Sequence, residues 1–277
     1  MTTSTALRVS LDSLDAASVA VHRTVLASLP RRFVVTDGGP AEVTVVCGRN
    51  PDWLDLVARA VSGGARGVIL IRPGLADADR VRALSAAVAG RAVVAVDTPY
   101  ANDQTWTAAR HEIAADAREA SIVDSVVAVT GGDPAGALID QLAVVAALVD
   151  VRGLRLIHRT AAGYLVAGPA GGTWVTLAGV TSGAVGAGLA VDVVAADRRW
   201  QVRFDGRAAA IPTEVTLHDL TGTHARSLTY ESGHRAIWRH LHEAITGNGT
   251  VAWSLDGLAD TLAVAGRLLG QPEGART

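Results

Sequence analysis

The chain has 277 residues, and 25 basic against 27 acidic residues give a formal net charge of -2. Hydrophobic residues make up 49% of the chain, enough for a large buried core, so an intrinsically disordered protein is excluded. The charge balance lacks the basic excess of proteins that bind phosphate backbones, so we expect no nucleic-acid partner. All 25 basic residues are arginine, which excludes chemistry that needs a lysine, such as a Schiff base or a lysine-containing phosphate loop.

Cys47 is the only cysteine, so a disulfide and a multi-cysteine metal site within one chain are excluded. It lies in the apolar run Val43–Cys47, where a buried structural thiol is the expected role. The first residues lack a basic segment followed by an apolar stretch, and no run of about 18 apolar residues occurs. We therefore expect a cytoplasmic protein without a membrane span, and we predict no metal site.

The first hundred residues alternate short apolar runs with amphipathic stretches. This alternation is typical of βαβ units around a buried parallel sheet. We expect a Rossmann-like domain over residues 1–118. Its predicted strands are Leu7–Leu11, Arg32–Thr36, Val43–Cys47, Gly67–Ile71 and Ala92–Val96. Its predicted helices are Leu14–Leu29, the stretch that Asn50 caps and Gly63 ends, and Asp77–Ala89.

The pattern changes after Tyr100. A polar-faced helix over Asp103–Glu119 leads into a second part, residues 119–277, in which closely spaced strands follow one another without helices between them. We expect an α+β domain with a large open, mainly antiparallel sheet. Its predicted strands are Ser121–Val129, Leu154–His158, Gly163–Val166, Thr173–Leu177, Leu189–Ala195, Gln201–Phe204, Glu214–His218 and Arg226–Tyr230. Its predicted helices are Ala135–Val149, Ser232–Ile245 and Ser254–Gly270.

Four segments in this order resemble the Gfo/Idh/MocA (glucose–fructose oxidoreductase / inositol dehydrogenase) family. The resemblance covers most of the chain and implies a dinucleotide-binding domain followed by a substrate and dimerisation domain. The segments are a first helix with His22 that ends in Leu29-Pro30, the strand Gly67–Ile71 with Arg72-Pro73 after it, Gly136–Asp140, and the helices that follow Tyr230 and Ser254.

The chain differs from the family at the positions that bind the cofactor and handle the proton. The three glycines of the dinucleotide fingerprint would fall at Leu14, Ala16 and Val19, whose Cβ atoms obstruct a pyrophosphate. The family's lysine is Arg72, which stays protonated at any relevant pH, and the family's histidine is Val144. The resemblance therefore implies a degenerate member.

Five residues are candidates for the site. Arg72 and Asp97 end two predicted parallel strands, and we expect them to bind substrate, although Arg72 could equally form a structural ion pair between the two halves of the chain. Asp140 and Tyr100 are the candidate catalytic residues, implied by their positions in the family pattern. Asp37 could hold the ribose of a cofactor, but before Gly-Gly-Pro it is more readily explained as a turn former.

Other clusters carry weaker signals. The segment Gly183–Gly188 favours a hairpin or a bulge over a displaced phosphate loop. The histidines near the C-terminus, His234, His240 and His242 among them, fit no zinc spacing and are interpreted as helix-face residues. Trp174 and Trp200 could cover the open sheet face, whereas Trp53, Trp106 and Trp238 are expected to pack in a core or an interface.

Two functional hypotheses remain open. The first is a non-redox version or pseudoenzyme, without a cofactor, that binds a small polar metabolite or partners an active paralogue. The second is an active oxidoreductase that binds NAD(P) through an altered loop and uses Asp140 or Tyr100 for proton traffic. Both predict a homodimer through the C-terminal sheet, because a large sheet with one uncovered face must bury it.

Overall fold

The computed structural model describes residues 6–11, 14–130, 133–184, 186–206 and 211–270, and the chain divides into two compact units. Unit 1 is Met1–Thr98 with Gly233–Ala259, and unit 2 is Pro99–Ser232 with Asp260–Thr277. This division differs from the expected single boundary at residue 118, because the chain returns to unit 1 after leaving unit 2. The reason is the helix α6 (Gly233–Ile245), whose buried residues join the core of the first sheet.

Unit 1 is built on a five-stranded sheet with the order β2-β1-β3-β4-β5, in which every neighbouring pair is parallel. This confirms the predicted parallel sheet. All five residues of β4 are buried, as expected for a central strand covered on both faces. In chain order the strands are β1 (Leu7–Ser10), β2 (Phe33–Val35), β3 (Val43–Cys47), β4 (Gly67–Ile71) and β5 (Val93–Asp97).

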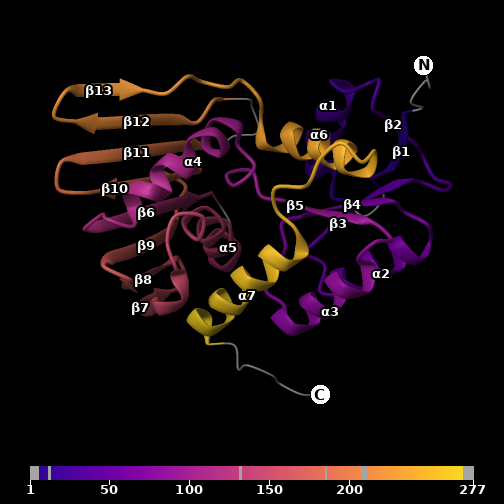
Figure 1. Ribbon diagram of the computed structural model, residues 1–277. Helices are drawn as coiled ribbons and strands as arrows, with labels where there is room; N and C mark the ends of the chain where they lie inside the picture. The colour runs from indigo at the N-terminus through magenta and orange to yellow at the C-terminus, as the bar shows by residue number, and fades with distance from the viewer. Residues whose placement is uncertain (1–5, 12–13, 131–132, 185, 207–210, 271–277) are drawn as a thin grey trace. The chain divides into compact units, whose positions relative to one another are not determined.

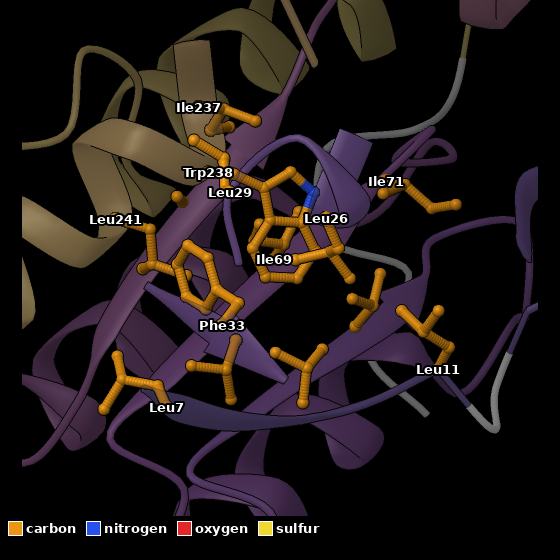
Figure 2. Close-up of a cluster of buried hydrophobic side chains, with 14 residues drawn as sticks. Leu7, Leu11, Leu26, Leu29, Phe33, Ile69, Ile71, Ile237, Trp238 and Leu241 are labelled. Atoms are coloured by element: carbon orange, nitrogen blue, oxygen red, sulfur yellow. The ribbon is translucent and has the colours of Figure 1, made fainter. Parts of the chain in front are cut away.

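Helices cover both faces of this sheet. Figure 1 shows α1 (Ala16–Ala27) and α6 on one side of the strands, and α2 (Trp53–Ser62) and α3 (Ala78–Val88) on the other. On the α1 and α6 side, Trp238 lies at the centre of a cluster of buried apolar side chains (Figure 2). The α2 helix begins later than expected, because Asp52 is its N-cap and Asn50 instead accepts a hydrogen bond from the Asp52 N–H.

Unit 2 is built on an eight-stranded sheet with the order β13-β12-β11-β10-β6-β9-β8-β7. Neighbours are antiparallel except for the interior pair β6 and β9, which is parallel, so the predicted mainly antiparallel sheet is confirmed. The strands are β6 (Ile122–Val129), β7 (Arg155–Thr160), β8 (Gly163–Ala170), β9 (Thr173–Thr181), β10 (Gly188–Val194), β11 (Arg198–Asp205), β12 (Glu214–Asp219) and β13 (Gly222–Ala225).

The helices α4 (Gln104–Ala117) and α5 (Pro134–Val145) pack against this sheet (Figure 1). A buried chain of hydrogen bonds fixes α5. The Tyr164 hydroxyl donates to Gln141 Oε1 at 2.9 Å, and the Gln141 amide donates to Ser125 Oγ at 2.9 Å. A short 3-10 helix, η1 (Val151–Gly153), follows α5, and α7 (Leu255–Leu269) closes the chain. No helix in the described part of the chain is long and apolar enough to span a membrane.

The opposite face of the eight-stranded sheet carries exposed apolar side chains. The strand registers place these residues on one face, because paired residues and residues two apart share a side. They are Ile122, Val126, Leu165, Trp174, Val180 and Val194. Trp174 is 50% exposed, as predicted for the open face, whereas Trp200 is 1% exposed and donates its indole N–H to Asp116 at 2.8 Å, so its prediction was wrong. Trp53, Trp106 and Trp238 are buried as predicted.

Two predicted local features differ from the structure. Arg226–Tyr230 is not a strand: the Arg226 N–H donates to the Val215 carbonyl of β12 at 2.8 Å, but the Thr229 N–H donates to Thr105 Oγ1 of α4, and the Arg226 side chain pairs with Glu112 of α4. The segment Gly183–Gly188 is not a hairpin, because it joins β9 to β10 and these strands lie on opposite sides of β6. Residue 185 of that segment lies outside the described residues.

Candidate functional site

Arg72 directly follows β4 at the carboxyl edge of the parallel sheet. Among the described residues it is the only non-glycine residue with a positive φ, +47°. Its turn packs on Gly48, where a Cβ would lie 2.5 Å from Cα of Pro73 and whose carbonyl accepts the Gly74 N–H at 2.9 Å. Backbone strain of this kind persists only where the surroundings enforce it, and it is concentrated at functional sites.

The Arg72 guanidinium faces an acidic residue of the first helix. Its Nη1 lies 3.9 Å from Asp15 Oδ2, and both side chains are about half exposed, at 50% and 48%. Such an exposed pair contributes at most about 1 kcal/mol to stability. This weak pair lies within unit 1 and is not the predicted ion pair between the two halves of the chain; it leaves the guanidinium able to bind an anion from solution.

Asp97, the last residue of β5, forms the centre of a buried polar cluster. Its side chain is 1% exposed, and its Oδ2 accepts a hydrogen bond of 2.6 Å from Nδ1–H of His234, the second residue of α6. Its other oxygen, Oδ1, is buried without a hydrogen-bond partner. Burial alone would raise the pKa of Asp97, but the charge and hydrogen bond of His234 outweigh it and the pKa is lowered. Asp97 is therefore an ionised, buried carboxylate.

His22 in α1 belongs to the same cluster but has a different role. Trp238 Nε1–H donates to His22 Nδ1 at 3.1 Å, and His22 Nε2 lies 3.8 Å from Asp97 Oδ2. An indole nitrogen is only a donor, so Nδ1 of His22 must be an acceptor and the neutral ring must carry its proton on Nε2. Burial lowers the pKa of His22. His22 is thus held neutral, in one tautomer.

The same hydrogen bond argues against a metal ion. His22, Asp97 and His234 bring ligand atoms within 4.8 Å of one another. A histidine ligand must offer a lone pair, and it normally donates its other N–H to an acceptor. His22 has the opposite arrangement, because Nδ1 accepts from Trp238 and Nε2 carries the proton. These residues do not fit a metal site.

The N-terminus of α1 is where a dinucleotide pyrophosphate would be expected to bind. There the Asp15 side chain caps the helix, accepting from the Ser18 N–H at 2.8 Å and from the Ser18 hydroxyl at 3.0 Å. A fixed carboxylate thus uses a donor that a pyrophosphate would need, and it brings a like charge. The described residues at this position do not fit the family's mode of binding a nicotinamide dinucleotide.

The remaining candidate residues contact other partners. Asp37 follows β2, its side chain is 92% exposed, and it pairs with Arg23 at 3.3 Å. Tyr100 is buried in unit 2, with its ring 5.4 Å from that of Phe204; burial and then the charge of Asp140 raise its pKa. Val144 is fully buried in α5 and has a packing role.

The structure therefore groups the predicted residues by unit. Arg72 and Asp97 end neighbouring strands of unit 1, whereas Tyr100 and Asp140 belong to unit 2. Sequence reasoning missed His22 and His234, because a histidine in a helix gives no sign of its partner 75 or more residues away in the chain. The sole hint was that Asp97 ends a buried strand, where a carboxylate needs a partner.

Comparison with solved structures identifies the fold. UDP-N-acetylglucosamine 3-dehydrogenase GnnA from Acidithiobacillus ferrooxidans superposes with a TM-score of 0.75 at 13% identity, covering 97% of this chain and 98% of that one. A dehydrogenase from Chromobacterium violaceum gives 0.73 at 14% identity, with 96% and 95% covered. An oxidoreductase from Agrobacterium radiobacter, in complex with NAD+, L-tartaric acid and magnesium, gives 0.69 at 12% identity, with 98% and 97% covered.

These structures are oxidoreductases of the Gfo/Idh/MocA type, so the predicted resemblance is confirmed for the fold. No protein-family model matches the chain, and no curated protein matches it by sequence. The chain thus has the fold of these structures along nearly its whole length, at 12–14% sequence identity.

Proposed function

We propose that this protein is a non-redox version of the oxidoreductase fold, which binds a small, polar, anionic metabolite at the carboxyl edge of the five-stranded sheet through Arg72. The observation that supports this best is the Asp15 carboxylate at the N-terminus of α1. In a dinucleotide-binding fold that helix terminus binds the pyrophosphate with its backbone N–H groups.

The charge of Asp15 also opposes such binding. Two unit charges 4 Å apart repel each other by about 1 kcal/mol where water screens them, as it does the half-exposed Asp15, which is roughly fivefold in affinity. Leu14, Ala16 and Val19 add side chains where a pyrophosphate loop has glycines. The occupied Ser18 N–H, the charge of Asp15 and the side chains of Leu14, Ala16 and Val19 all disfavour a nicotinamide dinucleotide.

Titration of the purified protein with NADH and NADPH, followed by calorimetry and tryptophan quenching, tests this proposal. We expect no saturation at millimolar cofactor. The variant Asp15→Ser keeps a helix cap but removes the charge, and it should raise any residual affinity. Asp77→Ser is the matched control, because Asp77 caps α3 in the same way. Saturable binding to the unmodified protein in the micromolar range would overturn the proposal.

The second candidate is an active NAD(P)-dependent oxidoreductase with an altered cofactor loop. It is favoured by the Agrobacterium radiobacter structure of the same fold, which is described as a complex with NAD+. Asp140 and Tyr100 would then handle the proton. Micromolar cofactor binding in the same titration would support this candidate, and Tyr100→Phe would then be expected to lower turnover.

The proposed partners are a small metabolite, a second copy of this chain and, for a pseudoenzyme, an active paralogue. The second copy would cover the exposed apolar face of the eight-stranded sheet. We expect sedimentation velocity at micromolar concentration to give a dimer, and Val126→Glu with Trp174→Arg to give a folded monomer. A monomer for the unmodified protein across this range would count against the dimer.

A further inference from the structure

The helix α6 ends in a turn that contains two glycines with an asparagine between them, Gly247-Asn248-Gly249. Gly247 has a φ of +78°, and its N–H donates to the Ala244 carbonyl at 3.2 Å. The Asn248 N–H donates to the Glu243 carbonyl at 2.7 Å. This pair of bonds is the Schellman arrangement, which ends many helices at a glycine. Asn248 and Gly249 follow the left-handed residue, and both are exposed.

The backbone nitrogen of Gly249 can react with the side chain of the residue before it. The nitrogen that follows an asparagine reaches Cγ of that side chain by closing a five-membered ring. A glycine presents this nitrogen without a Cβ beside it. Among the described residues, the Gly249 N–H has no hydrogen-bond partner, so its nitrogen is not held elsewhere.

The side chain of Asn248 is held by one exposed hydrogen bond. Its Nδ2 donates to Thr246 Oγ1 at 3.1 Å, and the Thr246 hydroxyl donates to the His242 carbonyl at 2.9 Å. Exposed side chains change rotamer within picoseconds to nanoseconds, so this bond does not keep Cγ of Asn248 away from the Gly249 nitrogen. Both reacting groups are therefore accessible in the folded protein.

We propose that Asn248 is a site of spontaneous deamidation in the folded protein, and that the product weakens the end of α6. The Gly249 nitrogen attacks Cγ of Asn248. The N–Cγ bond forms, the Cγ–Nδ2 bond breaks, and Nδ2 leaves as ammonia with the proton of the Gly249 amide. Water then opens the cyclic imide at either carbonyl and gives aspartate or isoaspartate, each with one added negative charge. This inference is independent of the anion site proposed at Arg72.

The added charge is unfavourable at this position. A carboxylate at residue 248 lies at the C-terminus of a helix, which carries the negative end of the helix dipole. Glu243 adds a like charge, because a Cβ on Gly249 would lie 3.9 Å from its Oε2. Isoaspartate also lengthens the backbone by one atom and changes the spacing on which the two bonds of the turn depend. Glu243 pairs with Arg32, the residue before β2, at 3.0 Å, so the weakened turn adjoins a contact between α6 and the first sheet.

The other two asparagines of the chain are internal controls. Asn50 precedes Pro51, whose nitrogen has no proton to lose. Asn102 is 1% exposed, and the N–H of the following Asp103 donates to a backbone carbonyl at 3.1 Å. We therefore expect Asn248 alone of the three to react.

Incubation of the folded protein at pH 7.5 and 37 °C, followed by cleavage after arginine and mass spectrometry, tests the proposal. The peptide His240–Arg267 contains Asn248 as its only asparagine or glutamine. We expect this peptide to gain about 1 Da with time and to separate into two products, and to do so faster at pH 9, because the attacking nitrogen must lose its proton. An unchanged mass in the folded protein, even where the urea-unfolded chain gains it, would overturn the proposal.

Two variants test the attacking group. Gly249→Ala places a Cβ beside the nitrogen, at a residue whose φ is not positive, although this Cβ would lie 3.3 Å from Cβ of Glu243. Asn248→Gln keeps an exposed amide but needs a larger ring, so it serves as the test if Gly249→Ala does not fold. Each variant should keep its original mass over the same incubation. A variant that still gains mass would contradict attack by the Gly249 nitrogen.

The effect on α6 is measured with Asn248→Asp, which carries the added charge from the start. Its urea midpoint should be lower than that of the unmodified protein. Asn50→Asp is the matched control, because Asn50 lies just before α2, at the end of a helix where negative charge is favourable. The midpoint of the control should not fall. Equal midpoints for Asn248→Asp and the unmodified protein would overturn the effect on α6.

Discussion

Replacement of Trp238 by phenylalanine removes the donor on which the state of His22 depends. Trp238 is fully buried, its N–H donates to His22 at 3.1 Å, and its ring packs edge-on against Phe33 at 5.0 Å. The phenylalanine ring can keep the contact with Phe33 but offers no donor. Nδ1 of His22 is then a buried acceptor without a partner, and the ring can change tautomer.

The expected loss of stability has two parts. A buried acceptor left without its donor costs about 1–3 kcal/mol. The smaller ring leaves a space in the cluster of Figure 2, which we expect to cost roughly 1–2 kcal/mol more, less than a full truncation to alanine. The free energy of unfolding of unit 1 should therefore fall by about 2–5 kcal/mol in total.

Urea unfolding followed by circular dichroism measures this loss, and a double-mutant cycle with His22→Leu isolates the hydrogen bond. The double variant removes both partners, so its loss should be smaller than the sum of the single losses by about 1–2 kcal/mol. Trp53→Phe in the same cycle is the control, because Trp53 belongs to α2 on the other side of the sheet. Additivity within about 0.5 kcal/mol for the Trp238 cycle would refute the reasoning.

Three further predictions concern stability. Burial lowers the pKa of His22 below its usual 6.5, so the unfolded chain binds the extra proton and the free energy of unfolding should fall as the pH drops below this value. His22→Leu should therefore flatten the pH dependence of the urea midpoint. A smaller pH dependence should remain, because burial also lowers the pKa of His242. Tyr164→Phe should cost about 1–3 kcal/mol, because it leaves the buried Gln141 Oε1 unpaired, and a normal midpoint would contradict that network. Gly179→Ala should lower the melting temperature, since its Cβ would lie 2.3 Å from the Tyr164 ring; adding Tyr164→Leu should recover part of the loss.

The sequence was sufficient for most of the secondary structure because each signal is local. The strand Val43–Cys47 and the strand Gly67–Ile71 have the predicted bounds, since an apolar run between helical segments has few alternatives. Prediction failed where contacts with a residue distant in the chain decide the local structure. Arg226–Tyr230 has the composition of a strand, yet the Thr229 N–H donates to Thr105 of α4, and the Arg226 side chain pairs with Glu112 of the same helix.

For the candidate site too, the sequence predicted local features but not those that depend on distant residues. Arg72 and Asp97 could be placed at the carboxyl edge from the sequence, because a strand that ends at a known residue puts the next polar side chain there. Their electrostatic roles could not be assigned. The +47° φ of Arg72 depends on its packing against Gly48, and the ionisation of Asp97 depends on His234, 137 residues later in the chain.

By itself, the sequence determined the parallel and antiparallel halves, the absence of lysine chemistry and the absence of glycine at positions 14, 16 and 19, because these depend on residue identity and local periodicity. Only the tertiary structure decided that α6 returns to the first sheet, that Asp15 takes a donor which a pyrophosphate would need, and that Trp238, His22, Asp97 and His234 form one chain of contacts. The physical reason is that proton affinity and hydrogen-bond state depend on atoms within a few ångströms, and those atoms come from residues far apart in the chain.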